Sequence, residues 1–161
     1  METTYFGAGC FWGVEHAFQH IDGVIETKVG FMGGTTENPT YKQVCGDDTG
    51  HVETTKVVFD PSKVSYRDLV NKFFEIHDPT QLNAQGADIG EQYRSVIFYT
   101  SEEQKIVAKE VIKELTDAKK YNKLITTTVE PAKEFYLAEE YHQNYSHKTG
   151  DYTCGIKINE K

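Results

Sequence analysis

The sequence is short of basic residues. It contains 17 Lys and Arg against 25 Asp and Glu, which gives a formal net charge of −8 at pH 7. A surface that binds nucleic acid or an anionic membrane needs an excess of cations, so this balance argues against both kinds of partner. The sequence also lacks an apolar run of the ~20 residues that a membrane span requires, and its first residues do not resemble a signal peptide. We therefore expect a cytoplasmic protein.

Cysteine is scarce as well. Only Cys10, Cys45 and Cys154 occur, and no two of them form a Cys-x-x-Cys pair. Three cysteines cannot all pair within one chain. Their number favours a reducing compartment, in which any disulfide is transient and catalytic, over a secreted disulfide framework.

The histidines do not form a metal-binding pattern. His16 and His20 are four residues apart, but no Glu follows His16, so the metalloprotease motif is missing. His142 and His147 are five residues apart, roughly 140° around a helix, and converge poorly on one ion. We expect His16 and His20 on a solvated helix face and no metal site.

The most informative stretch lies near the start, at residues 7–13, where Cys10 follows small residues and precedes two aromatic ones. Residues 3–6 are typical of a strand. Downstream, apolar residues recur at helical spacing, at Val14, Ala17, Phe18 and Ile21. Cys10 is therefore expected where a strand ends and a helix begins, and the unpaired N–H groups of that helix favour a thiolate.

Two interpretations of Cys10 stay open at this point. A free cysteine is most often a buried structural residue. Here, however, the glycines permit close backbone approach, and Phe11 and Trp12 can form an apolar pocket beside the sulfur. We favour a reactive cysteine.

The rest of the chain alternates between strand and helix patterns. Further strands are expected at 24–32, 51–59, 94–99 and 124–129, and helices are expected from Ser65 to before Pro79 and from Glu102 to about Lys120, with Ile106 and Val111 among the inward residues. Polar connections occupy 33–50 and 80–92, and 135–145 suggests a short helix or turn. This order predicts an α+β fold, a two-layer α/β sandwich with a ferredoxin-like core and a mixed sheet. We expect a single catalytic domain, 1–161, with a mobile, loop-rich tail from about 148.

Glu53 is the notable carboxyl on these strands. It shares its face of the expected strand with Val57 and Phe59. A carboxyl on an apolar face either finds a partner or stays protonated, because desolvation disfavours its charged form. A solvated glutamate near a strand end is the alternative.

A thiolate at position 10 has two broad uses, attack on a carbonyl carbon or attack on an oxidised sulfur. Cys10, His142 and Asn144 have the spacing of a papain-like cysteine hydrolase. Against this, the family's Cys-Gly-Ser-Cys-Trp signature is absent, and no residue before Cys10 supplies a side-chain amide for an oxyanion hole.

The stretch Gly9-Cys10-Phe11-Trp12-Gly13 closely resembles the A-type peptide methionine sulfoxide reductases. Further blocks of the sequence resemble the same family in the same order, from about residue 5 to 147: Gly33-Gly34, 38–41, Val44-Cys45, 48–53, 59–61, Phe74, 77–80, Leu82-Asn83, Gln85-Gly86, Asp88, Gly90, 92–95, Ala138-Glu139 and 141–143. A set of motifs this long and ordered is highly specific.

The resemblance implies that Cys10 attacks the sulfur of an S-configured methionine sulfoxide, peptide-bound or free. Phe11 and Trp12 would hold the S-methyl group. The attack would release methionine and leave a sulfenic acid on Cys10, which a second thiol converts to a disulfide. The resemblance suggests Cys154, in the tail, as this resolving cysteine, although Thr153 interrupts the family's Gly-Tyr-Cys-Gly-like segment; Cys45 is interpreted as structural.

The resemblance also implies a group of residues around the sulfoxide oxygen. Glu53 would give it a proton, Tyr41 and Tyr93 would donate hydrogen bonds to it, and Asp88 would belong to the same network. A buried carboxyl that is neutral at pH 7 suits the first task, and fixed donors suit the second.

We accordingly expect an oxidoreductase that repairs oxidised methionine, with thioredoxin, glutaredoxin or glutathione as the electron source. Two thiols supply both electrons, so we expect no cofactor. A non-catalytic α/β binding module, with an inert Cys10, remains as an alternative from a different class.

Overall fold

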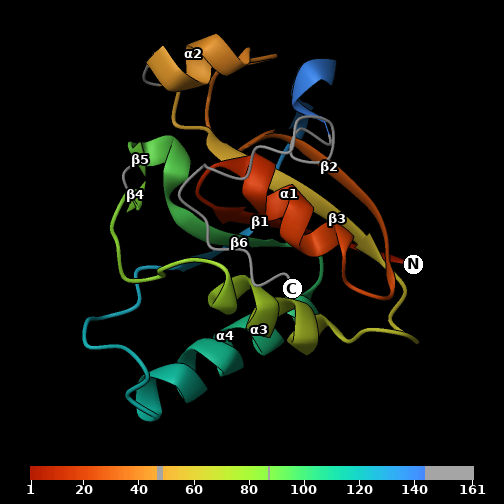
Figure 1. The fold of residues 1–161 in the computed structure, drawn as a ribbon, viewed down its shortest axis with the longest axis vertical. Helices are drawn as coiled ribbons and strands as arrows, with labels where there is room; N and C mark the ends of the chain where they lie inside the picture. Colours follow the sequence, from red (N-terminus) through yellow and green to blue (C-terminus); the bar gives the residue numbers. More distant parts are fainter. Residues whose placement is uncertain (47–48, 87, 144–161) are drawn as a thin grey trace.

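The computed structural model in Figure 1 describes residues 1–46, 49–86 and 88–143. Within them, a six-stranded sheet has the order β7-β6-β1-β3-β2-β8. The strands are β1 (Glu2–Ala8), β2 (Val24–Met32), β3 (Val52–Phe59), β6 (Ser95–Tyr99), β7 (Thr128–Pro131) and β8 (Tyr136–Leu137). Neighbours pair antiparallel except β6 and β7, which are parallel. The predicted α+β fold with a mixed sheet is confirmed.

Three helices cover one face of this sheet: α1 (Phe11–Gln19), α3 (Tyr66–Glu75) and α4 (Glu102–Asp117). Because side chains alternate along a strand, every second residue of β1, β3 and β6 points to the helices. The resulting core contains Phe6, Ala8, Val14, Phe18, Val57, Phe59, Leu69, Phe73, Ile97, Ala108 and Val111. None of the helices in the described ranges is long and apolar enough to cross a membrane.

The opposite face of the sheet has a smaller apolar cluster. Met32, Val52, Val96 and Phe98 lie there, and Ala132 and Phe135 pack against them from the segment between β7 and β8. The segment that leaves β7 therefore covers this face before it reaches the other edge of the sheet as β8, beside β2.

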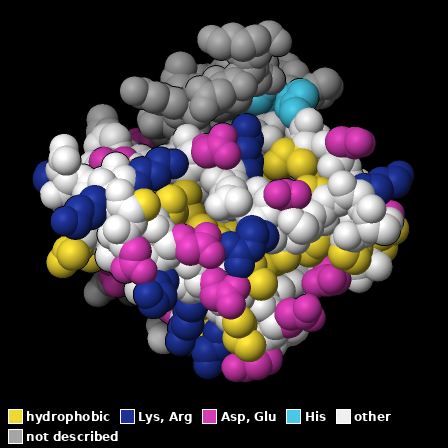
Figure 2. Space-filling view, turned by 90° about the horizontal axis from the view of Figure 1, so that it is seen from below, with side chains coloured by type: hydrophobic (Ala, Val, Ile, Leu, Met, Phe, Trp, Pro, Cys, Tyr) yellow, Lys and Arg dark blue, Asp and Glu magenta, His cyan; other side chains and the backbone are white. Residues whose placement is uncertain are grey.

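The charged surface over the helices is mixed in sign. Figure 2, which views the molecule from below, shows acidic and basic side chains interspersed. Arg67 of α3, for example, pairs with Glu110 and Glu114 of α4. A surface of this kind does not offer a continuous basic patch to a polyanion.

The two polar connections contain short regular elements. The first holds α2 (Tyr41–Gly46), and the second holds a small hairpin, β4 (Ala84–Gln85) with β5 (Asp88–Ile89), followed by the 3-10 helix η1 (Glu91–Tyr93). A second 3-10 helix, η2 (Glu140–His142), comes after β8. The expected helix or turn at 135–145 is thus a two-residue strand and a 3-10 turn in its described part. In Figure 1, α2 and the blue segment holding η2 lie at the top of the view.

The expected strand at 124–129 is wrong for residues 124–127. Strand β7 begins only at Thr128, and Leu124 is 82% exposed. The backbone N–H of Thr126 donates to the carbonyl oxygen of Pro79 at 2.7 Å, and its hydroxyl donates to that of Gln81 at 2.9 Å. The segment before β7 therefore hydrogen-bonds to a loop rather than to the sheet.

Two side chains lie opposite to their expected environment. His16 is buried instead of solvated, because nearly every side of α1 is covered: Phe11, Gly13, Val14, Glu15, His16, Ala17 and Phe18 are all buried, while His20 is exposed. Ile106, expected to point inward from α4, is 51% exposed. The helical spacing of apolar residues in the sequence therefore does not determine which residues at the boundary of the buried face are covered.

Candidate active site

Cys10 occupies the junction between β1 and α1. Strand β1 ends at Ala8, Cys10 is the N-cap residue, and α1 begins at Phe11. Gly9 has φ +97°, a conformation that favours glycine. A Cβ on Gly7 would lie 2.6 Å from Cγ1 of Val52, so the small residues of the motif are needed for close packing. The expected placement of Cys10 is confirmed by these bounds.

The Cys10 side chain is 4% exposed. It is disulfide-bonded, and its partner is not among the side chains that the structure describes. Cys154, predicted to resolve Cys10, lies outside the described residues, as do His147 and Asn144. Cys45 lies in α2, but its side chain is not described.

Glu53 lies beside the start of α1. Its side chain is 1% exposed, and its Oε1 accepts a hydrogen bond from the backbone N–H of Phe11 at 3.2 Å. Burial raises its pKa to about 8; the Phe11 hydrogen bond opposes this rise, and the negative charge of Asp88 adds to it. The alternative of a solvated carboxylate is therefore wrong.

Four rings gather over this end of α1: Phe11, Trp12, Tyr41 and His142. The ring centroid of Tyr41 lies 6.0 Å from Phe11 and 6.1 Å from Trp12. His142 lies 4.3 Å from Tyr41 and 5.6 Å from Trp12. The two aromatic residues after Cys10 thus form part of a cluster of rings, and residues from α2 and η2 complete it.

His142 has a defined role in this cluster of rings. The indole Nε1–H of Trp12 donates to its Nδ1 at 2.9 Å, so the neutral ring carries its proton on Nε2. Burial lowers the pKa of His142, and the nearby Glu139 partly opposes this shift. The neutral form is the one that can accept the indole hydrogen, so burial and hydrogen bond agree.

The segment 138–143 holds the cluster of rings against β2. The side-chain amide of Gln143 accepts from the backbone N–H of Val29 at 2.9 Å and donates to the carbonyls of Val29 and Ala138 at 2.8 and 3.0 Å. The carboxylate of Glu139 accepts from the backbone N–H of Tyr41 at 3.3 Å. One turn therefore orients residues from α1, α2 and β2.

Asp88 and Tyr93 both lie in the second polar connection, in β5 and η1. Burial raises the pKa of Asp88, and its Oδ2 has no hydrogen-bond partner within the described ranges. The negative charge of Asp88 also contributes to the raised pKa of Glu53. Tyr93 is half-buried in η1, which packs against β3.

Comparisons with known proteins establish the family of this chain. A family model described as peptide methionine sulfoxide reductase matches residues 2–161. This chain belongs to that family.

The peptide methionine sulfoxide reductase MsrA of Methanothermobacter thermautotrophicus is 55% identical over 95% of this chain and 90% of its own length. Reduced Mxr1 of Saccharomyces cerevisiae is 37% identical, with a TM-score of 0.91 over 99% of this chain and 92% of its own. Mxr1 in complex with Trx2 shares the fold, with a TM-score of 0.66 and 24% identity over 99% of this chain and 90% of its own.

Two of the family blocks contain residues whose contacts the sequence did not reveal. The sequence spacing relates His142 only to a papain-like hydrolase pattern or to His147 as a metal ligand, and it indicates no role for Glu139 or Gln143. The available signal was their place in the blocks at 138–139 and 141–143. Their partners are distant in the chain, since Gln143 and Val29 are 114 residues apart, so sequence spacing could not identify them.

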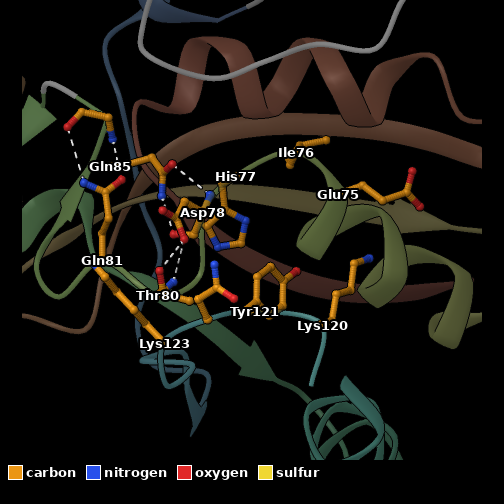
Figure 3. Close-up of a pocket in the computed structure, with 12 residues that line it drawn as sticks. Glu75, Ile76, His77, Asp78, Thr80, Gln81, Gln85, Lys120, Tyr121 and Lys123 are labelled. Atoms are coloured by element: carbon orange, nitrogen blue, oxygen red, sulfur yellow. Dashed lines mark hydrogen bonds between the residues drawn. The ribbon is translucent and has the colours of Figure 1, made fainter. Parts of the chain in front are cut away.

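A cavity of about 650 Å³ lies apart from these residues (Figure 3). It is lined from the end of α3, the loop after it and the segment that follows α4, by residues 75–78, 80, 81, 85, 86 and 120–123. None of the residues predicted to act in catalysis lines it. Its Asp78 and Gln81 are already hydrogen-bonded to Thr80 and Gly86.

The described residues offer no metal site: no group of three or more His, Cys, Asp or Glu among them could hold an ion.

Proposed function

We propose that the chain reduces the S epimer of methionine sulfoxide, peptide-bound or free, to methionine. One observation carries this proposal: a carboxyl with a pKa of about 8, Glu53, lies beside the helix start that presents Cys10. At neutral pH such a carboxyl is largely protonated and can serve as a general acid. The S preference rests on the family resemblance.

The Cys10 thiolate attacks the sulfoxide sulfur while Glu53 protonates its oxygen. Oxygen ends on Cys10 as a sulfenic acid, and methionine leaves with two electrons that Cys10 has lost. Oε1 of Glu53 accepts the Phe11 N–H, whereas Oε2 has no partner in the described part of the chain. We assign the transferred proton to Oε2.

The other site residues bind the methyl group of the substrate and stabilise the charge that develops on its oxygen. Phe11 and Trp12 hold the methyl group against the cluster of rings, supported by their contacts to Tyr41 and His142. Tyr41 and Tyr93 donate hydrogen bonds to the oxygen as negative charge develops there, and Asp88 shares in the proton network through its electrostatic link to Glu53.

A second thiol restores the enzyme. We propose that Cys154 attacks the sulfenic acid, releases water and forms a disulfide with Cys10, or that an external thiol does so. Thioredoxin or another dithiol then reduces the product; Mxr1, a relative, has been solved with Trx2. Two thiols supply both electrons, so this cycle uses no cofactor. We assign it to a single catalytic domain, 1–161, in the cytoplasm.

A thioredoxin-coupled assay on separated S and R sulfoxides tests the proposal. We expect turnover of the S epimer, and Cys10→Ser should abolish it because a hydroxyl is a far weaker nucleophile than a thiolate. Cys45→Ser is the matched control and should stay active. Turnover by Cys10→Ser, or none by the unsubstituted chain, would contradict the proposal.

The resolving step has its own readout. After one equivalent of sulfoxide, peptide mass mapping should find a Cys10–Cys154 link, and Cys154→Ser should still release one equivalent of methionine. A stable sulfenic acid without that link would assign recycling to an external thiol. An alkylating reagent should label Cys10 rapidly before turnover and should fail to label it after turnover. This result would exclude the alternative of a non-catalytic binding module with an inert Cys10.

A further inference from the structure

Arg94 joins two segments of the proposed site. Its Nη1 donates to the backbone carbonyl of Gly50 at 3.2 Å and to that of Glu91 at 3.1 Å. Gly50 lies just before β3, which carries Glu53, and Glu91 begins η1, which carries Tyr93. The hydrogen bond to Gly50 spans 44 residues of sequence. The guanidinium of Arg94 thus links the segment before β3, the strand that carries Glu53, to η1, which carries Tyr93.

A third segment meets the same side chain. A Cβ on Gly33, just after β2, would lie 3.5 Å from Nη2 of Arg94 and 3.1 Å from Cζ of Phe98. Gly33 begins the connection that leads to Tyr41. The neighbouring backbone is tied to β3 as well, since Thr35 N–H donates to the carbonyl of Thr49 at 3.0 Å. The end of β2 and the segments bearing Glu53 and Tyr93 therefore lie around Arg94.

The contacts of Arg94 hold backbone segments in position and do not neutralise a carboxylate. Both of its acceptors are backbone carbonyls, and within residues 1–46, 49–86 and 88–143 no carboxylate forms an ion pair with its guanidinium. The side chain is half-buried. A planar guanidinium holds its acceptors in fixed directions, which a flexible ammonium does not.

We propose that Arg94 is a positioning residue that sets Glu53 relative to Asp88 and Tyr93, and thereby governs proton transfer to the sulfoxide oxygen. This inference rests on the proposed function. Arg94 itself does not touch the reacting atoms. Substitution of Arg94 should slow the sulfoxide-reduction step. It should leave binding of the methyl group unchanged, because that binding depends on Phe11 and Trp12.

The test compares single-turnover rates of methionine release for Arg94→Met, Glu53→Gln and the double variant, each with the full chain. Displacement of a reacting group by about 1 Å can cost about a hundredfold in rate, so we expect a loss of ten- to a hundredfold for Arg94→Met with little change in KM. In the Glu53→Gln background, where proton transfer is already lost, Arg94→Met should cost less than about twofold further.

Arg67→Met is the control, since Arg67 pairs with Glu110 and Glu114 on the helical surface and should keep the full rate. Equal losses from Arg94→Met with and without Glu53 would overturn the inference and leave Arg94 a purely structural residue. An unchanged rate in Arg94→Met would also overturn it.

Arg94→Lys gives a second measurement if the Met variant does not fold. It keeps the charge but loses the planar fork, so we expect a loss of a few-fold that also disappears in the Glu53→Gln background. A full rate in Arg94→Lys, or a loss that persists beside Glu53→Gln, would contradict the inference. If neither the unsubstituted chain nor Arg67→Met reduces sulfoxide, the proposed function fails instead.

Discussion

At the scale of single residues, Glu53 combines two opposed effects. Burial disfavours its charge, whereas the Phe11 N–H at the start of α1 favours it. Burial is the larger effect, so the carboxyl keeps its proton up to a pKa of about 8. A carboxyl fully exposed at the end of a strand would be ionised at neutral pH and could not serve as the acid.

The rate of sulfoxide reduction should therefore depend on pH in a defined direction. In the proposed mechanism protonated Glu53 is the active form, so the single-turnover rate should fall as pH rises through about 8. Glu53→Gln should be slower and should lose this fall, because an amide donates a hydrogen bond but no proton. Rapid-quench measurements from pH 6 to 9.5 check this; a fall of equal size in Glu53→Gln would refute the assignment.

The same shift also affects stability. The pKa of Glu53 is raised from 4.5 to about 8 on folding, so the folded state binds more protons than the unfolded state between these values. The stability contribution is full below pH 4.5 and is lost as pH rises through about 8. Relative to Glu53→Gln, the unsubstituted chain should lose unfolding free energy between pH 5 and 8 in urea titrations. The control Glu75→Gln changes an exposed residue and keeps Glu53, so it should show the same loss as the unsubstituted chain.

At the scale of elements, α3 shows how local sequence sets a helix. The backbone N–H of Asp68 donates to Oγ of Ser65 at 3.0 Å, and the backbone N–H of Ser65 donates to the Asp68 carboxylate at 3.4 Å. This capping box precedes a stripe that buries Tyr66, Leu69, Val70, Phe73 and Phe74. The helix was predicted correctly because its start signal and its apolar spacing are both local.

Ser65→Ala should lower the unfolding free energy by about 1 kcal/mol, because it leaves N–H groups at the start of α3 without the hydroxyl acceptor. Ser65→Thr, which keeps that acceptor, is the matched control and should lose less. Denaturant unfolding monitored by circular dichroism measures both. Since α3 lies away from the proposed site, sulfoxide reduction should stay unchanged; a loss of activity without a loss of stability would contradict this placement.

At the scale of the whole molecule, Phe6 connects the sheet to two of the helices. Its ring lies 4.8 Å from Phe18 of α1 and 5.2 Å from Phe73 of α3, and its side chain is fully buried. The strand that carries Phe6 also leads directly to Cys10. The core therefore fixes the end of β1 from which the active-site turn departs.

Phe6→Ala should lower the unfolding free energy by about 3–5 kcal/mol, through lost burial and an unfilled cavity. Ile106→Ala, on the exposed side of α4, should cost about 0.5 kcal/mol or less. Unfolding in guanidinium chloride measures both values, and the slope of unfolding free energy against denaturant concentration should be the same for both variants. A loss of similar size in the two variants would show that the core does not centre on Phe6.

The sequence by itself determined those structural features that depend only on residues close together in the chain. The turn that presents Cys10, the capped helix α3 and the inward face of Glu53 all follow from local spacing, glycine and capping. The family motifs also indicate Glu53 and the two aromatic residues after Cys10 as site residues.

Only the tertiary structure decided which distant segments meet. The burial of Glu53, the burial of His16 and the loop contacts of Thr126 depend on surfaces supplied from elsewhere in the chain. The contacts of Arg94 and Gln143 likewise join segments whose distance in sequence carries no information on their distance in space. Packing and long-range hydrogen bonds therefore turned a reactive cysteine motif into a defined site.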